Sequence, residues 1–541
     1  MLQTKITSIL LLLLFSQKVI AQNKYWVTFR DKAEVVFNPF DYFDQRTIDQ
    51  RIRNNISLND STDFPVRQDY IDQVIRFADS VSWSSRWLNG LAIFASAEAA
   101  EHIKNLAFVA FVESMGSISA VAVKGDVFAE KPLEKLKQED LALLKYQTER
   151  LQGESFSRNA IDGNGIRIAV FDVGFPGVND HPAFAHLRDG NKIVATYDFV
   201  GHKDNVYCNH WHGTATLSCI AGKIDSVNIG LATGAEIFLA RTEQSFWEKF
   251  SEEENWLAAA EWADKHGVNI ISSSLGYTNK RYFNFQMDGH TSLVARAASI
   301  AASKGILVIN AAGNEGSDSW HYIDTPGDAD SVLTIGGTNP LTDSHIYFSS
   351  YGPASDGRLK PNLCAPGEVI AVKPKGLSRV SGTSFSTPLV AGFAACAWQT
   401  HRQWTNMELF DALEKSAHLY PYFDYAHGFG IPQATEFTGS KKVTEPTFDF
   451  VIVNNEVKVM LREQFSYAET EAALGYTVQR NFYYKVEDRN GFLKSYIVMI
   501  AQQKEMLHLF ADDFADGDVL TIHFEGYTNS LEFEGEIKEI K

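Results

Sequence analysis

Cysteine is scarce in this sequence, whose 541 residues include only Cys208, Cys219, Cys364 and Cys396. So few cysteines exclude a fold held together mainly by disulfides. One or two bridges stay open, because spacing along the chain does not determine pairing. For Cys219 and Cys396 we favour the other reading, a small buried apolar side chain on a helix.

Positive charge is also in short supply, with 49 Lys and Arg against 67 Asp and Glu and a formal net charge of −18. Binding to a phosphate backbone needs a basic surface, so we expect no nucleic-acid partner. After residue 21, no segment reaches the ~18 consecutive apolar residues of a membrane-spanning helix. We therefore expect no transmembrane segment in the mature chain.

The first 21 residues have the pattern of a secretory signal peptide. Lys5 precedes the apolar run Ile9–Phe15, and Ala21 offers a small residue for cleavage before Gln22. The run is too short to cross a bilayer. We expect the mature protein to be exported, either to the periplasm or out of the cell.

The length of the chain predicts about three domains, and the pattern of expected helices and strands changes at two places. Residues 22–140 read as an α+β domain, and the charged stretch Ala129–Arg150, which has no strong core signal, reads as a linker followed by the first element of the next domain. The expected strands of the α+β domain are Lys24–Phe29, Leu91–Ala95 and Phe108–Glu113, and its expected helices are Gln68–Asp79 and Ala97–Asn105.

Residues 141–438 alternate strands with helices, which predicts a doubly wound parallel sheet of the α/β class. The strands Val268–Ser274 and Ile306–Ala312 are nearly all apolar, as strands buried on both faces should be. The other expected elements are strands Ile166–Phe171 and Ile237–Ala240 and helices Gly213–Gly222, Ser251–Lys265 and Leu293–Ser303.

Residues 439–541 predict an antiparallel β-sandwich of about 100 residues without a catalytic constellation. Asn490-Gly491 is the strongest hairpin signal in the chain. The expected strands are Phe448–Val453, Val457–Arg462, Thr477–Val486, Leu493–Ile500, Met506–Phe510, Val519–Phe524 and Leu531–Glu536.

The segment Ser381–Gly392 organises the middle domain. A small-residue turn leads to Ser384, Pro388 suits a first helical turn, and the apolar residues that follow predict a buried helix. A serine at a helix start lies where free N–H groups favour developing negative charge. The simpler interpretation is a helix cap.

Three further polar residues fall at strand ends or helix starts, where ligands bind in such a sheet. Asp172 ends a strand, His212 opens a helix, and Asn314 follows a strand. Acyl transfer by a serine needs a histidine to take its proton, a carboxylate to orient that histidine, and an amide to hold the oxyanion. Taken singly, Asp172 fits a cap and Asn314 a turn. Cys208-x-His210-x-His212 offers a metal site as a rival.

These residues stand in motifs that resemble those of the subtilisin-like serine proteases, or subtilases. Gly382-Thr383-Ser384-Phe385-Ser386-Thr387-Pro388 resembles the serine motif, with Phe385 and Ser386 in place of the usual Met and Ala. His212-Gly213-Thr214 resembles the histidine motif and Ala312-Gly313-Asn314 the oxyanion motif. Phe171-Asp172-Val173-Gly174 resembles the aspartate motif, with Val173 where Thr or Ser is commoner.

The resemblance implies a serine endopeptidase. Ser384 would be the nucleophile, His212 the general base and then acid, and Asp172 the orienting carboxylate, with Asn314 and the Ser384 N–H as oxyanion donors. Ser274-Leu275-Gly276 resembles the strand on which the family binds its peptide substrate. No cofactor is required. Structural calcium is common in the family, and loops such as Asp324–Asp330 allow it.

The resemblance also makes residues 22–140 an inhibitory propeptide, with a protein or peptide substrate as the other partner. We expect Ser384 itself to cut the chain between Met115 and Leu144, where no strong core signal protects the backbone. Two alternatives remain. One is a binding protein that keeps the fold without activity, and the other is a dedicated processing enzyme that recognises its partner through the sandwich.

Overall fold

The computed structural model describes residues 23–115, 130–244, 251–278, 281–439, 445–466, 472–473, 476–477, 480–534 and 536–540. The expected signal peptide lies outside these residues. The chain forms two compact units, of which one joins Met1–Asn38 with Asn59–Ile118 and the other joins Pro39–Leu58 with Ser119–Lys541. The segment Pro39–Leu58, which we predicted inside the N-terminal domain, therefore belongs to the larger unit.

The smaller unit is an antiparallel sheet with helices, as the sequence predicted. Its strand order is β2-β3-β1-β4, with β1 Asn23–Phe29, β2 Ser80–Ser85, β3 Gly90–Ala95 and β4 Val109–Ser114. Helices α4 Gln68–Ile75 and α5 Ala97–Lys104 bury Val74 and Ile103 in the same core as Val27 and Leu91. The sequence did not predict β2, because its residues are mostly serines.

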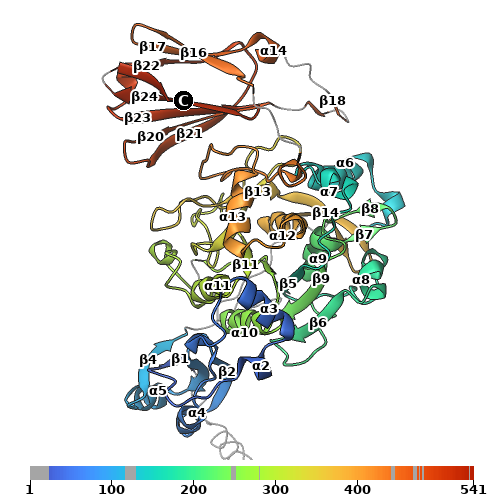
Figure 1. Cartoon of the computed structure of the whole chain (residues 1–541), viewed down its shortest axis with the longest axis vertical. Coiled ribbons are helices and arrows are strands. Elements are labelled where there is room, and N and C mark those ends of the chain that lie inside the picture. Colours follow the sequence, from blue (N-terminus) through green and yellow to red (C-terminus); the bar gives the residue numbers. More distant parts are fainter. Residues whose placement is uncertain are drawn as a thin grey trace, which may run out of the picture. The chain divides into compact units, whose positions relative to one another are not determined.

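The larger unit is built on a seven-stranded parallel sheet of order β13-β12-β11-β10-β5-β9-β6 (Figure 1). The α/β class that the sequence predicted is confirmed. The strands are β5 Arg167–Asp172, β6 Ile193–Asp198, β9 Glu236–Arg241, β10 Ile270–Ser273, β11 Leu307–Ala311, β12 Val332–Thr338 and β13 Leu363–Pro366.

Helices cover both faces of this sheet. Helices α9 His212–Ala221 and α12 Thr383–Thr400 contact one another and lie on one face, with Ile168 and Val170 of β5 in their core. Phe171 points to the other face, where its ring meets Trp256 of α10 Ser251–Lys265. Helix α11 Leu293–Ser303 packs beside α10. Successive residues of a strand point to opposite faces, so each strand supplies both cores.

The stretch Ala129–Arg150 has no strong core pattern in the sequence, but its second half packs into the main core. Helix α6 Gln138–Glu149 buries Leu143 and Leu144 in the main core, and Lys131 pairs with Leu377 of β15 Gly376–Ser381. The expectation that the backbone is unprotected as far as Leu144 is therefore wrong. Only the part before Lys131 remains for the predicted cut, and residues 116–129 of it lie outside the described residues.

The C-terminal part has two antiparallel sheets that share one core, which confirms the predicted sandwich. One sheet is β16-β17-β22, and the other is β21-β20-β23-β24-β25. We expected one strand at Leu531–Glu536, but two form there. The strands are β16 Phe448–Val453, β17 Glu456–Leu461, β20 Asn481–Glu487, β21 Leu493–Ile500, β22 Glu505–Phe510, β23 Asp518–Phe524, β24 Tyr527–Glu534 and β25 Glu536–Ile540.

Shorter elements complete the larger unit. The helices are α2 Pro39–Tyr42, α3 Gln45–Arg53, α7 Glu154–Arg158, α8 Ala185–Asp189, α13 Asn406–Lys415 and α14 Glu463–Ser466, and the strands are β7 Lys223–Ile224, β8 Val227–Asn228, β14 Glu368–Lys373, β18 Ala472–Ala473 and β19 Tyr476–Thr477. All four cysteines are free. Burial raises the pKa of the Cys219 thiol to about 12, as expected for an inert thiol on a core helix.

Candidate active site

The structure places Asp172 and His212 in direct contact. Asp172 is the last residue of β5 and is fully buried, and His212 is the first residue of α9. The His212 Nδ1 atom lies 2.9 Å from Asp172 Oδ1 and 3.0 Å from Oδ2. A Cβ on Gly213 would come within 2.3 Å of the Gly174 carbonyl, so glycine is needed for the helix to start this close to the strand.

Two further donors hold the Asp172 carboxylate. The Thr216 hydroxyl, one turn along α9 from His212, donates to Oδ2 at 3.0 Å, and the Val173 N–H donates to Oδ1 at 2.8 Å. Val173 stands where Thr or Ser is commoner in the family. This difference does not remove the hydrogen bond to Asp172, because residue 173 donates through its backbone N–H.

Ser384 is the second residue of α12, and a second serine holds its backbone. The Ser274 hydroxyl donates to the Ser384 carbonyl at 2.7 Å, and the Ser384 hydroxyl in turn donates to the Ser274 carbonyl at 3.4 Å. In an α-helix the Ser384 carbonyl would accept from the N–H of residue 388. That residue is Pro388, which has no N–H, so the carbonyl is available to Ser274.

Pro388 therefore stands in the second turn of α12, and its predicted place in the first turn is wrong. The predicted buried helix is confirmed, since α12 buries Thr383–Trp398 continuously. Gly382, with φ of +147°, precedes the helix and lets the chain turn into it from β15.

Asn314 follows β11 and is fixed by the residue that precedes Ser384. Its side-chain Oδ1 accepts from the Thr383 N–H at 2.9 Å and from the Thr383 hydroxyl at 3.1 Å. The oxygen end of the amide is thus occupied, which leaves the NH₂ end to interact elsewhere. On the other side of the serine, the Phe385 ring lies 5.4 Å from the His212 ring. Asn314 and His212 therefore contact the two chain neighbours of Ser384.

The segment Ser274–Gly276 directly follows β10, so it lies at the same sheet edge as Asp172. A carboxylate that the sequence analysis did not single out stands beside it. A Cβ on Gly276 would lie 2.5 Å from Asp324 Oδ2, and a Cβ on Gly313 would lie 2.6 Å from the same atom. The buried Asp324 carboxylate therefore occupies the space between this segment and the Asn314 loop.

The metal alternative at Cys208, His210 and His212 is not supported. His212 bonds to Asp172, and the Cys208 thiol donates to the Asn205 carbonyl at 3.9 Å. Burial and the neighbouring His212 lower the pKa of His210. In the described part of the chain, no cluster of three or more His, Cys, Asp or Glu residues could hold a metal ion.

The loop Asp324–Asp330 is the one that the sequence analysis named as allowing calcium. Its Asp328 carboxylate accepts the Gly289 N–H at 2.8 Å.

The sequence analysis identified the residues with chemistry but not those that hold them. Thr216 could have been found from its position four residues after His212, on the same helix face. Ser274 was predicted to bind substrate, but neither it nor Thr383 gives a signal of its supporting contact, because these contacts depend on the tertiary fold. None of the described helices is long and apolar enough to cross a bilayer.

Two family models match the chain. Residues 163–435 match the subtilase family, and residues 24–129 match the peptidase S8 propeptide domain of Bacteroidota. Neither match reaches the C-terminal sandwich.

Curated relatives are similar over about half of the chain. Subtilisin NAT of Bacillus subtilis subsp. natto is 30% identical over 296 residues, which cover 53% of this chain and 70% of the relative. Serine protease AprX of Bacillus subtilis (strain 168) is 29% identical over 313 residues, 52% of this chain and 67% of the relative. M-protease of Shouchella clausii (strain KSM-K16) is 26% identical over 271 residues, 50% of this chain and only 63% of the relative.

Proposed function

Because the chain belongs to the subtilase family, we propose that it is an exported serine endopeptidase that is made as a zymogen and cut by its own Ser384. The observation that carries the proposal is the convergence at Ser384. The His212–Asp172 pair contacts Phe385 on one side of the serine, and Asn314 binds Thr383 on the other.

In the proposed reaction, His212 takes the proton of the Ser384 hydroxyl as the oxygen attacks the substrate carbonyl. The buried Asp172 carboxylate holds the imidazole through Nδ1, which keeps Nε2 as the basic atom and stabilises the imidazolium that forms. Asn314 Nδ2 and the Ser384 N–H then bind the oxyanion. The imidazolium returns its proton to the leaving amine.

A peptide substrate would bind along Ser274, Leu275 and Gly276 as an added strand. This segment suits that role because Ser274 is hydrogen-bonded to Ser384, which fixes the distance between the bound peptide and the nucleophile. Main-chain pairing of this kind accepts many sequences, as an endopeptidase requires.

The propeptide part of the proposal rests on the family match over residues 24–129. The proposed cut lies between Met115 and Glu130, because the chain is tied to β15 from Lys131 onward. A tethered inhibitor protects the exporting cell from digestion, since its effective concentration at the cleft is high. We propose export through residues 1–21. Structural calcium stays a proposal without an assigned ligand set.

The C-terminal sandwich makes a dedicated processing enzyme the second candidate. A protease that acts on one partner gains specificity from a separate recognition module, and the sandwich has its own core. Cleavage of casein compared with cleavage of peptide libraries distinguishes the two. A general protease degrades both, whereas a dedicated enzyme leaves casein intact. A binding protein without activity would cleave neither.

The test of the proposal is labelling of the secreted protein by a fluorophosphonate probe. Ser384→Ala should lose all labelling, because it removes the nucleophile. Ser386→Ala is the matched control, since Ser386 is buried on the same helix and donates to the Pro366 carbonyl. It should label like the wild type. Persistent labelling of the Ser384→Ala protein would refute the assignment.

A further inference from the structure

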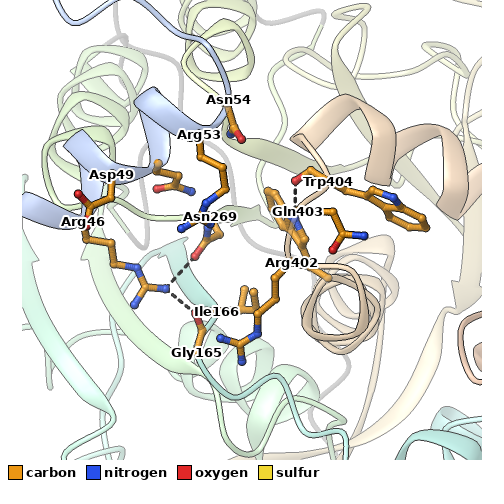
Figure 2. A pocket seen from close by; sticks show the side chains of 12 residues that line it. Arg46, Asp49, Arg53, Asn54, Gly165, Ile166, Asn269, Arg402, Gln403 and Trp404 are labelled. Atoms are coloured by element: carbon orange, nitrogen blue, oxygen red, sulfur yellow. Dashed lines mark hydrogen bonds between the residues drawn. The ribbon is translucent and has the colours of Figure 1, made fainter.

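A cavity of about 620 Å³ lies at the amino edge of the parallel sheet (Figure 2). Its walls come from three parts of the larger unit, namely α3, the residues just before β5, and the segment Trp398–Trp404. Gly165 and Asn269 line it and precede β5 and β10, so it lies at the amino ends of these strands. Asp172 ends β5 at the other edge, about 17 Å away along the six residues of the strand. The cavity is therefore distinct from the site of the proposed reaction.

Three arginines line this cavity, although the chain as a whole carries a formal net charge of −18. Arg46 and Arg53 come from α3, and Arg402 follows α12 on the other side of the cavity (Figure 2). Among the described residues that line the cavity, Asp49 alone is acidic, and its carboxylate already accepts from the Gln45 amide at 2.7 Å. The cavity is therefore a basic region on an acidic protein.

Two of the arginines have no carboxylate partner in the described part of the chain. Arg53 is exposed and makes no hydrogen bond or ion pair there. Arg402 is also exposed, and its guanidinium donates to the Asn164 carbonyl. A guanidinium group carries five N–H donors, so most of the donors of these two side chains remain for a ligand.

The third arginine has a carboxylate partner that it shares. Arg46 pairs with Glu236 at 3.2 Å, and Arg167 donates to the same carboxylate oxygen at 2.9 Å. Arg46 also donates to the Gly165 carbonyl, and a Cβ on Gly165 would lie 2.6 Å from Arg402 Nη1. Two guanidinium groups thus converge on one glycine. Burial and the charges of Arg167 and Arg402 lower the pKa of Arg46, and an anion bound between these groups would offset their repulsion.

The size and the walls of the cavity indicate the kind of anion. Pockets of about 300–1,000 Å³ hold small organic molecules, so this cavity exceeds what one inorganic ion needs. Trp398 and Trp404 give it an aromatic wall, which is fixed because the Trp398 indole N–H donates to the Trp404 carbonyl at 3.0 Å. The planar fork of a guanidinium binds carboxylate and phosphate oxygens through paired hydrogen bonds.

We propose that this cavity binds a small organic molecule that carries two or three carboxylate or phosphate groups. Arg46, Arg53 and Arg402 bind the anionic groups, and the aromatic wall contacts the carbon skeleton. Because the site is formed only in the folded chain, the ligand stabilises that chain against unfolding. The proposal goes beyond the proposed function and does not depend on Ser384.

The test is isothermal titration calorimetry of the full chain with Ser384→Ala, at constant ionic strength. This variant keeps α3 joined to the rest of the chain even if the wild type cuts itself. Citrate and inorganic pyrophosphate are the probes, and each should bind once per chain and at least about 10-fold more tightly than acetate, which offers one carboxylate. The tighter of the two probes shows whether carboxylate or phosphate groups are preferred. The tighter probe at saturation should also raise the melting temperature.

Arg53→Ala and Arg402→Ala should each weaken binding of the tighter probe by about 10-fold or more, because each removes charged hydrogen bonds. Arg402→Lys keeps the charge but loses the planar fork, so it should weaken binding by less than Arg402→Ala does. Arg158→Ala is the matched control. It removes the same charge from a side chain that is 72% exposed and lies outside the cavity. It should bind the probe like the parent protein.

Two results would overturn the proposal. One is the absence of saturable binding of citrate and of pyrophosphate at millimolar concentrations. The other is binding that Arg53→Ala, Arg402→Ala and Arg158→Ala weaken equally, because such binding would respond to net charge and not to this cavity. A wild-type protein without peptidase activity would refute the proposed function and leave this result unaffected.

Discussion

At the scale of single residues, two side chains of the proposed catalytic group, Asp172 and Asn314, are held by partners that perform no chemistry. The Thr216 hydroxyl binds Asp172, and Thr383 occupies the Asn314 oxygen with both its N–H and its hydroxyl. An asparagine amide has two chemically different ends, so fixing the oxygen also fixes the direction of the NH₂ group. The orientation of the oxyanion donor is therefore set before a substrate binds.

Replacing Asn314 by Ala should lower kcat by about 10²–10³, the loss measured when a subtilisin loses this donor. KM should change little, because the hydrogen bond forms mainly in the transition state. Thr383→Val should cost less, since the Thr383 N–H still binds the amide oxygen. Steady-state kinetics with a short peptide measures both. A loss in the Asn314→Ala protein as complete as that of Ser384→Ala would indicate a structural role instead.

The Asp324 carboxylate predicts the preferred substrate side chain. The Asp324 carboxylate lies next to Gly276 and Gly313, so we expect a peptide that binds along Ser274–Gly276 with its carbonyl at Asn314 to place a side chain beside it. A buried carboxylate stabilises a cationic side chain there, so peptides with Lys or Arg before the scissile bond should be cleaved best. Asp324→Asn should lower kcat/KM for these peptides by about 30-fold or more and spare Phe peptides. An equal loss for both peptide classes would contradict this expectation.

At the scale of elements, apolar patterns predicted many of the helices and strands, although β6, β12 and β13 of the parallel sheet were missed. The predicted helix Leu293–Ser303 coincides with α11, and the predicted strand Leu493–Ile500 coincides with β21. The serine-rich β2 was missed, because its place in a sheet depends on its neighbours. The site residues were predictable from their motifs, but their supports were not. Ser274 and Ser384 are 110 residues apart in sequence, so only the folded chain brings them together.

The Ser274 hydroxyl takes the place of the N–H that Pro388 lacks as donor to the Ser384 carbonyl. This predicts how the stability of the protein responds to replacing either residue. Ser274→Ala should lower the free energy of unfolding by about 1–3 kcal/mol, because the Ser384 carbonyl loses its donor. Adding Pro388→Ala to that protein supplies a helical N–H to the same carbonyl and should restore part of the loss. Urea unfolding of the single and double variants in the Ser384→Ala background measures this. Simple addition of two destabilising effects would contradict the explanation.

At the scale of the whole molecule, the sandwich is not an independent appendage to the sheet-based part of the larger unit. Tyr483 of β20 is buried in a cluster with Leu419 and Tyr422, and its ring lies 5.6 Å from that of His427. Asn481 also donates to the Thr342 carbonyl at 2.7 Å. Near residue 440 the sequence changes from alternating strands and helices to strands alone, which indicates a separate core. This change gives no sign of the contacts with the rest of the unit, because they join residues far apart in the sequence.

Removing residues 440–541 should therefore leave a folded but less stable catalytic domain, since Leu419 and Tyr422 lose their cover. Tyr483→Ala in the full chain should reproduce much of that loss, about 3–5 kcal/mol for a buried aromatic side chain. Phe492→Ala is the control, because Phe492 is 63% exposed. Thermal unfolding compares the three proteins. Equal melting temperatures for the truncated and full-length chains would show that the contacts contribute nothing to stability.

The most direct measurement of the central claim, that Ser384 is the nucleophile of a self-processed protease, is N-terminal sequencing of purified wild-type and Ser384→Ala proteins. The wild type should begin between Met115 and Glu130. The Ser384→Ala protein should begin at Gln22, because removal of the signal peptide is the one expected cut that does not need Ser384. A Ser384→Ala protein trimmed at the same bond in the absence of any other protease would contradict the claim. So would an active wild type that keeps Gln22 as its first residue.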